Sequence, residues 1–118
     1  MAVVFDYSSV EGEDVVEEGA VGVRVRWLID SRLGADKFAM RMFEFQPGGH
    51  TALHSHPWEH EVYVLEGRGV VLAGGKRHKV QAGTVVYIPP NEPHQFRNDG
   101  DTVMRILCLI PVEGCAGR

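Results

Sequence analysis

The chain has 118 residues, of which 44% are hydrophobic and 24% charged, and its net charge at pH 7 is -4. This length suits one domain with a single core. The acidic balance argues against nucleic-acid binding, because the basic cluster at residues 76–79 is short. No apolar run approaches the roughly 20 residues that a membrane span needs. No signal peptide is recognisable either, so we expect a cytoplasmic protein with reduced cysteines.

Runs of strand-forming residues follow one another along the chain, and helical periodicity is almost absent. The acidic stretch 11–18 has little to bury and is expected to form a loop or a loosely held arm. Cys115 lies in a Gly-rich tail that we expect to be mobile. Strands are predicted at residues 21–28, 38–45, 61–66, 69–73, 76–80, 84–88, 94–97 and 103–110, with a further short one at 51–56. The sequence therefore predicts an all-β protein.

Three of the six histidines fall within residues 54–60, in the string HSHPWEH. His54 and His56 would point to the same face of a strand, since alternate residues share a face. Pro57 cannot continue a hydrogen-bond ladder, so the chain can turn there and bring His60 onto the next strand. An isolated His-x-His pair is more often a surface pair, but a third histidine strengthens the case for a metal site, because imidazole is the commonest metal ligand.

A fourth histidine, His94, follows the predicted strand 84–88 and a proline-rich turn. The remaining two, His50 and His78, have no comparable partners in the sequence and are expected to face solvent. The predicted metal ligands are therefore His54, His56, His60 and His94.

Two motifs with this spacing resemble those of the cupin superfamily. The residues that match the first motif are Gly48, His54, His56 and Gly67. Those that match the second are Gly83, Pro89, His94 and Asn98. Asn91 stands where the family has glycine, and asparagine tolerates a left-handed backbone. The resemblance implies a double-stranded β-helix, or jelly-roll barrel, in one domain over residues 1–118, with its core at about 38–112 and an N-terminal arm and strand at 1–37.

The third metal ligand of most cupins is a glutamate, and this chain offers both His60 and Glu61. Counting back from Gly67 places His60 in the family's ligand position, and a one-residue slip would point Glu61 to the other face of the strand. The string HSHPWEHE resembles a subgroup of small bacterial and archaeal cupins that bind manganese with four histidines. The resemblance implies manganese first and iron next, although imidazole also suits zinc, nickel and copper.

Five further residues are expected near the metal: Arg41, Trp58, Phe96, Ile106 and Cys108. Ile106 and Cys108 share one face of strand 103–110, and the opposite face carries Arg105, which is harder to bury. Phe96 shares a face of the predicted strand 94–97 with the predicted ligand His94. Arg41 could hold an anionic substrate or be a surface or interface arginine, and Trp58 could cover the pocket or simply pack.

Four neutral imidazoles would leave a divalent ion its full charge and two open positions in an octahedral shell. The resemblance then favours a metal-dependent oxygenase that uses manganese or iron and acts on a small organic molecule. The alternatives are a non-redox isomerase or hydrolase and a non-catalytic small-ligand-binding or sensor cupin. No catalytic base is assigned. We expect a homodimer that pairs through the apolar runs 21–28 and 38–45, with no nucleic-acid or membrane partner.

Overall fold

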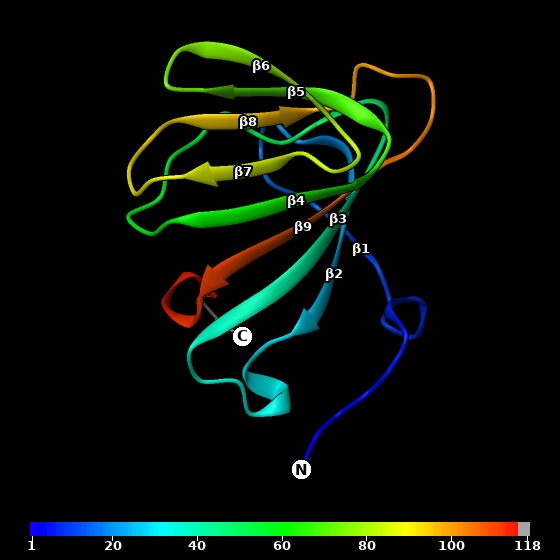
Figure 1. Ribbon diagram of the computed structural model, residues 1–118, viewed down its shortest axis with the longest axis vertical. Coiled ribbons are helices and arrows are strands. Elements are labelled where there is room, and N and C mark those ends of the chain that lie inside the picture. The colour runs from blue at the N-terminus through cyan, green and yellow to red at the C-terminus, as the bar shows by residue number, and fades with distance from the viewer. Residues whose placement is uncertain (116–118) are drawn as a thin grey trace.

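A curled antiparallel sheet forms most of the computed structural model, which describes residues 1–115 (Figure 1). Its nine strands within the described residues are β1 (Glu13–Asp14), β2 (Val21–Ile29), β3 (Phe38–His50), β4 (His60–Glu66), β5 (Arg68–Ala73), β6 (Lys76–Gln81), β7 (Val85–Ile88), β8 (His94–Arg97) and β9 (Met104–Pro111). Three short 3-10 turns accompany them: η1 (Tyr7–Ser9), η2 (Ser31–Leu33) and η3 (Val112–Gly114). No helix within the described residues is long and apolar enough to cross a membrane.

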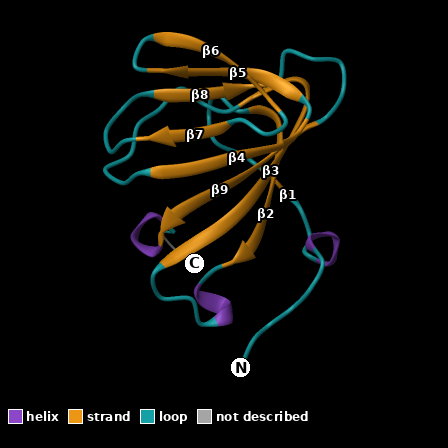
Figure 2. Cartoon of the chain, in the orientation of Figure 1, coloured by secondary structure: helices purple, strands orange, loops and turns teal. Residues whose placement is uncertain are grey.

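The strand order explains how one sheet can enclose a cavity. Neighbouring strands run β6-β5-β8-β3-β9-β4-β7, while β2 pairs with β3 and β1 pairs with β2. The long strand β3 pairs along most of its length with β2 and β9, and at its last residue with β8, so it joins both parts of the sheet. Figure 2 shows β5, β6 and β8 curling over the strands below them. The predicted all-β jelly-roll architecture is confirmed.

The eight longer predicted strands all form, with shifts at their ends, but the short strand predicted at 51–56 does not. Within that segment only His54 makes a β-bridge, with His94 of β8. Apart from this bridge, the backbone of the segment is joined to β8 by single hydrogen bonds and not by a ladder. For example, the N–H of Thr51 donates to the carbonyl of Phe96 at 2.9 Å. The segment therefore follows β8 as a loop, and the prediction of a strand there is wrong.

Strand β3 continues to His50, five residues beyond the strand predicted at 38–45, and so includes the Pro-Gly-Gly sequence at 47–49. The strand absorbs these residues as an irregularity, because the register with β2 shifts between Val21 and Val23. Gly49 fits there since it lacks a side chain: a Cβ would lie 2.6 Å from the carbonyl oxygen of Gly22.

The acidic N-terminal stretch is more ordered than the predicted loop or arm. Glu13 and Asp14 form β1, which pairs with β2. Beyond β1, the backbone N–H of Val15 donates to the carbonyl of Val23 at 2.9 Å. Part of the stretch therefore belongs to the sheet, and the pairing with β2 fixes the position of Val15.

Alternating burial along β4 and β9 defines the core. The largest fully buried side chains are Phe45, Val64, Val71, Ile88, Asn98, Met104 and Ile106. Asn98 is polar but satisfied: its amide donates to the carbonyls of Phe45 at 3.0 Å and Thr102 at 2.8 Å, and its oxygen accepts from the N–H of Gly100. This buried amide fixes the β8–β9 turn onto β3.

Cys115 is buried against the core rather than placed in a mobile tail. Its backbone N–H donates to the carbonyl of Val112 at 2.9 Å and closes η3. The expectation of a mobile segment is therefore wrong for this residue, because a local turn folds it back onto apolar neighbours.

Candidate metal centre

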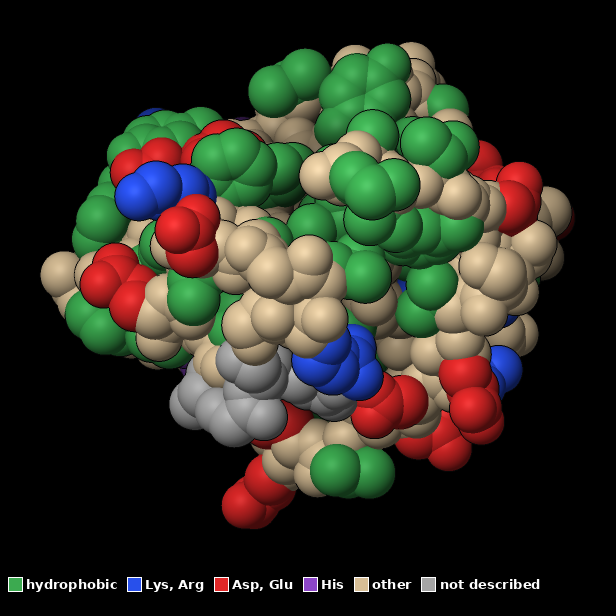
Figure 3. All heavy atoms as spheres, turned by 90° about the horizontal axis from the view of Figure 1, so that it is seen from below, with side chains coloured by type: hydrophobic (Ala, Val, Ile, Leu, Met, Phe, Trp, Pro, Cys, Tyr) green, Lys and Arg blue, Asp and Glu red, His purple; other side chains and the backbone are tan. Residues whose placement is uncertain are grey.

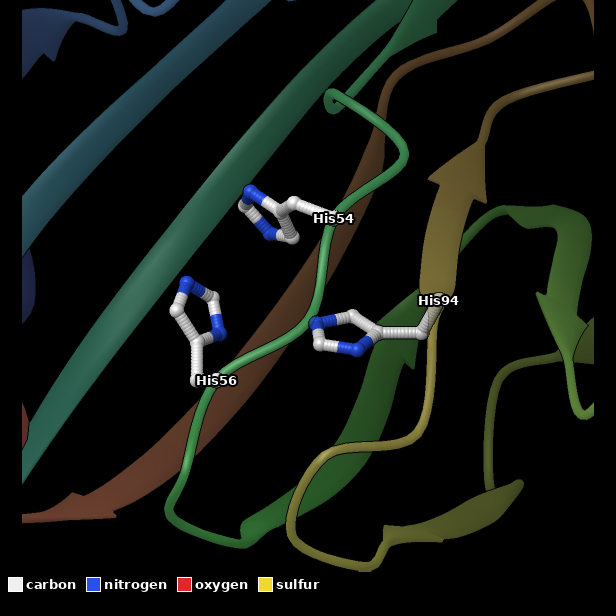
Figure 4. A group of neighbouring side chains, drawn as sticks. All are labelled: His54, His56 and His94. Carbon is white, nitrogen blue, oxygen red and sulfur yellow. The ribbon is translucent and has the colours of Figure 1, made fainter.

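The four histidines predicted as ligands lie together at one end of the curled sheet. His54 and His56 come from the β3–β4 connection, His60 begins β4 and His94 begins β8. Ligand atoms of His54, His56 and His94 all lie within 4.8 Å of one another, so these three could hold a metal ion (Figure 4). The ring of His60 lies 5.1 Å from that of His56 and 4.7 Å from that of His94, measured between centroids.

Backbone hydrogen bonds fix where the loop histidines lie. His54 and His94 exchange two bonds, with N–H to carbonyl distances of 3.2 and 2.9 Å. The N–H of Asn91 donates to the carbonyl of His56 at 2.6 Å, and Asn91 has a φ of 68°. Asn91 thus adopts the left-handed conformation predicted for the position where the family has glycine.

His60, and not Glu61, faces the other histidines. His60 is buried and Glu61 is exposed, as expected from the alternation of side chains along β4. Of the two remaining histidines, His78 is exposed as predicted. His50 is half-buried rather than solvent-facing, and its Nδ1 lies 3.1 Å from the carbonyl of Thr51 and 3.5 Å from Nε2 of Gln95 on β8.

The four rings open into a cavity of about 270 Å³. Most of its remaining wall is apolar, and the side chains that form this part are Val15, Val25, Trp27, Phe43, Phe96 and Ile106. Arg41, Cys108, Thr51 and Glu17 complete the lining. The structure therefore places four of the five expected neighbours of the metal on this wall, namely Arg41, Phe96, Ile106 and Cys108.

Trp58 lies behind the site instead of covering it. Its ring stacks on that of His56, with centroids 4.7 Å apart and an interplanar angle of 12°. On its other side it meets the C-terminal turn, since a Cβ on Gly114 would lie 2.8 Å from the indole. Of the two alternatives for Trp58, the structure therefore supports packing and not a lid over the cavity. The stacking also restricts the rotation of the His56 ring.

Three of the histidines, His56, His60 and His94, are held in the neutral form that metal binding requires. Burial, reinforced by the neighbouring histidines, lowers the pKa of His56 to about 4. Burial also lowers the pKa of His60 to about 3, with His94 and Arg41 adding to the effect. The pKa of His94 is lowered as well, again chiefly by burial.

The rings of His94, His56 and His60 each have a nitrogen lone pair that no group in the described part of the chain occupies. Nδ1 of His94 lies 2.9 Å from the carbonyl of Glu92, which can only accept, so this nitrogen carries the proton and Nε2 does not. Nδ1 of His56 and of His60 are buried and have no hydrogen-bond partner among the described residues. A set of uncommitted imidazole nitrogens close together fits a divalent transition-metal ion.

Glu17 is a site residue that the sequence did not predict. Its carboxylate lies 3.0 Å from Nδ1 of His54 and accepts a hydrogen bond from the N–H of that nitrogen, which leaves the other ring nitrogen available to a metal. Glu17 lies in the segment that follows β1, within the stretch expected to be a loop or arm. No local pattern distinguishes it from Glu18, and only the pairing of β1 with β2 brings it to the cavity.

Residues 41–110 match the family described as Cupin domain, which is more than half of the chain. The chain belongs to the cupin family. A polyketide cyclase from Streptomyces resistomycificus has a similar structure, with a TM-score of 0.89 and 38% identity over 95% of this chain and 80% of that one. The jelly-roll barrel and the two sequence motifs of this cupin thus agree with the family match.

Two curated relatives also match this cupin. An uncharacterized protein of Methanocaldococcus jannaschii is 40% identical over 52% of this chain and 50% of its own length. The 1-methylthio-D-xylulose 5-phosphate methylsulfurylase of Rhodospirillum rubrum is 38% identical over 63% of this chain and 47% of its own. The chain therefore spans about half the length of these relatives.

Proposed function

We propose that this cupin holds one divalent metal ion with His54, His56, His60 and His94 and uses it to transform a small organic molecule. The convergence of the four rings on one largely apolar cavity carries the proposal. Imidazole ligation is compatible with several ions. Manganese is proposed first because the HSHPWEHE string resembles that of the four-histidine manganese cupins, with iron next and zinc, nickel or copper as alternatives.

We propose non-redox chemistry, in which the bound ion would act as a Lewis acid on a carbonyl oxygen. The likeness to a polyketide cyclase at 38% identity supports this class. The histidines would hold the ion, and the apolar wall would exclude water from the bound molecule. The cavity of about 270 Å³ is slightly smaller than the roughly 300–1,000 Å³ of drug-sized sites, which favours a small substrate.

Exchange of α-hydrogens tests this function directly. A metal that polarises a carbonyl makes the neighbouring C–H acidic, so acetylacetone in deuterated water should exchange faster with the metal-loaded protein than with the metal-free protein. His94→Ala should abolish the acceleration, whereas Glu61→Ala should keep it. If the protein binds metal but accelerates exchange with none of manganese, iron or zinc, the proposed Lewis-acid chemistry fails and a binding module is favoured.

An oxygenase is the second candidate. The neutral charge of all four proposed ligands favours it, because such a shell leaves a divalent ion with its full charge and with open positions for two further ligands. Oxygen consumption by the manganese- or iron-loaded protein with catechols and β-diketones separates the two candidates. Substrate-dependent uptake that His94→Ala removes would support the oxygenase, and exchange without uptake would support Lewis-acid chemistry.

We also propose that the protein forms a homodimer. Phe38 and Val21, at the start of the two strands expected to pair, are 60% and 59% exposed. Exposed apolar side chains also gather in patches on the face seen in Figure 3. Such patches favour association. Light scattering should give twice the 13.1 kDa mass of one chain, and a 13.1 kDa particle at micromolar concentration would contradict the dimer.

A further inference from the structure

Arg41 places a positive charge in the cavity without a carboxylate beside it. It extends from β3, where it pairs with Cys108 of β9 and Trp27 of β2. Its guanidinium lies 4.8 Å from the ring centroid of Phe43 and 5.5 Å from that of Trp27. Its Nε is buried and makes no hydrogen bond to any described residue. The aromatic faces hold the side chain in place but do not neutralise it.

Two other arginines of the same sheet show the usual arrangement. Arg26 and Arg105 both pair with Glu44, with N–O distances of 2.9 and 2.7 Å. Among the described residues, no carboxylate lies within ion-pair distance of Arg41. An inward-facing cation without its anion is costly, so Arg41 differs from its neighbours in a way that packing does not explain.

The other groups in the cavity do not supply the missing negative charge. Cys108 lies 3.1 Å from Nη2 of Arg41, but burial raises the pKa of its thiol, so it stays neutral. Glu17 is the one carboxylate among the described lining residues, and it is engaged with His54. A divalent ion on the histidines would add further positive charge, which increases the attraction of the cavity for an anion.

We propose that Arg41 is an anion-binding residue and that the ligand of this cavity is a small organic carboxylate with a further carbonyl or hydroxyl oxygen. The planar guanidinium matches a carboxylate, which can accept from two of its N–H groups. The second oxygen would reach the metal, and this part of the inference rests on the proposed function. The apolar wall then surrounds the carbon skeleton between the two charged ends.

Binding of matched probes by the metal-free protein isolates the contribution of Arg41. Acetoacetate and methyl acetoacetate differ in the carboxylate, and calorimetric titration should show that the acid binds about 10- to 100-fold more tightly. Arg41→Met should remove this preference without weakening the ester, and Arg41→Lys should retain only part of it. Arg77→Met, which removes a charge from the exposed β5–β6 hairpin, is the matched control and should change nothing.

A spectroscopic readout tests ligand binding in the wild-type protein itself, and uses a variant only to assign the signal. In the wild-type protein, the Nε–H resonance of Arg41, assigned by its loss in Arg41→Lys, should shift when acetoacetate is added. Equal affinity for the acid and the ester, or an unshifted resonance, would overturn the proposal. Binding of inorganic phosphate with the same dependence on Arg41, but not of acetoacetate, would overturn the carboxylate class. Because these titrations are done without metal, they can succeed even if the proposed metal chemistry fails.

Discussion

The two faces of the β2–β3–β9 part of the sheet differ in whether their charged side chains have ion-pair partners. On one face, Glu44 is buried and accepts hydrogen bonds from both Arg26 and Arg105. On the other face, Arg41 and the histidine cluster leave polar atoms without partners in the described structure. Buried polar groups in proteins are normally satisfied. The comparison teaches that the paired face serves stability, whereas the unpaired face is arranged for a ligand.

Removing a histidine gives the largest effect expected on the unpaired face. His56→Ala, His60→Ala and His94→Ala should each weaken metal binding by more than about 100-fold, since even groups that only support a ligand contribute about 10- to 100-fold. The stability of the metal-free protein should change little in His56→Ala and His60→Ala, because each removes a ring whose buried Nδ1 has no hydrogen-bond partner among the described residues. Metal-buffered titration and thermal unfolding measure the two quantities.

Glu61→Ala is the control for the histidine variants, because Glu61 adjoins His60 but is exposed. It should leave one metal ion per chain. If Glu61→Ala empties the site while His60→Ala does not, the choice of His60 as third ligand is wrong.

Removing Glu44 should have the opposite effect. Glu44→Ala leaves Arg26 and Arg105 without their shared partner and should lower the free energy of unfolding by about 2 kcal/mol, less than for a fully buried pair because both arginines reach water. Metal affinity should remain within twofold of wild type. Denaturant unfolding with parallel metal titration tests this, and a loss of metal binding without a loss of stability would remove the distinction between the two faces.

A smaller effect is expected from Glu17, which supports a proposed ligand without reaching the metal. Glu17→Gln keeps the size of the side chain but loses the charge that orients His54, and should weaken metal binding about 10-fold. Glu18→Gln removes the adjacent exposed charge and should have no effect on metal affinity. Equal losses in the two variants would show a general effect of charge instead of an effect through His54.

The smallest expected effects concern the pH dependence of stability, which should differ between the two faces. Since the folded-state pKa values of His56 and His60 are about 4 and 3, the unfolded chain takes up protons first, and the metal-free protein should lose stability as pH falls from about 6.5. Burial alone would raise the pKa of Glu44, but hydrogen bonds from Arg105 and Arg26 hold it below its ordinary value. Its contribution should therefore be lost only below about pH 4.5.

Thermal unfolding of metal-free variants tests these two windows. His60→Gln should flatten the fall of Tm between about pH 6.5 and 4, and Glu44→Gln should flatten only the more acidic part. A His60→Gln profile parallel to that of the wild type would show that His60 is not buried in its neutral form.

Much of the barrel could be predicted from sequence, because strand periodicity and the glycine and proline positions are local signals. The parity argument that separated His60 from Glu61 also depends only on alternation along one strand, and the structure gives them the predicted faces. The path of residues 51–56 was missed, since a loop that follows a neighbouring strand with single hydrogen bonds resembles a strand in sequence.

The role of Glu17, and the choice between the two alternatives for Trp58, could not be predicted for a different reason. Each depends on a contact between segments far apart in the chain: Glu17 reaches His54 from the N-terminal stretch, and Trp58 packs against Gly114 near the C-terminus. Long-range contacts of irregular segments leave no periodic pattern. The two ion pairs of Glu44 could not be predicted from sequence either, because Arg26 and Arg105 lie on different strands.

X-ray absorption spectroscopy of the manganese-loaded protein tests the central claim most directly, since it counts imidazole ligands around the ion. The account predicts four in the wild type, three in His60→Ala and four in Glu61→Gln. Three imidazoles with a carboxylate oxygen that disappears in Glu61→Gln would contradict the four-histidine centre.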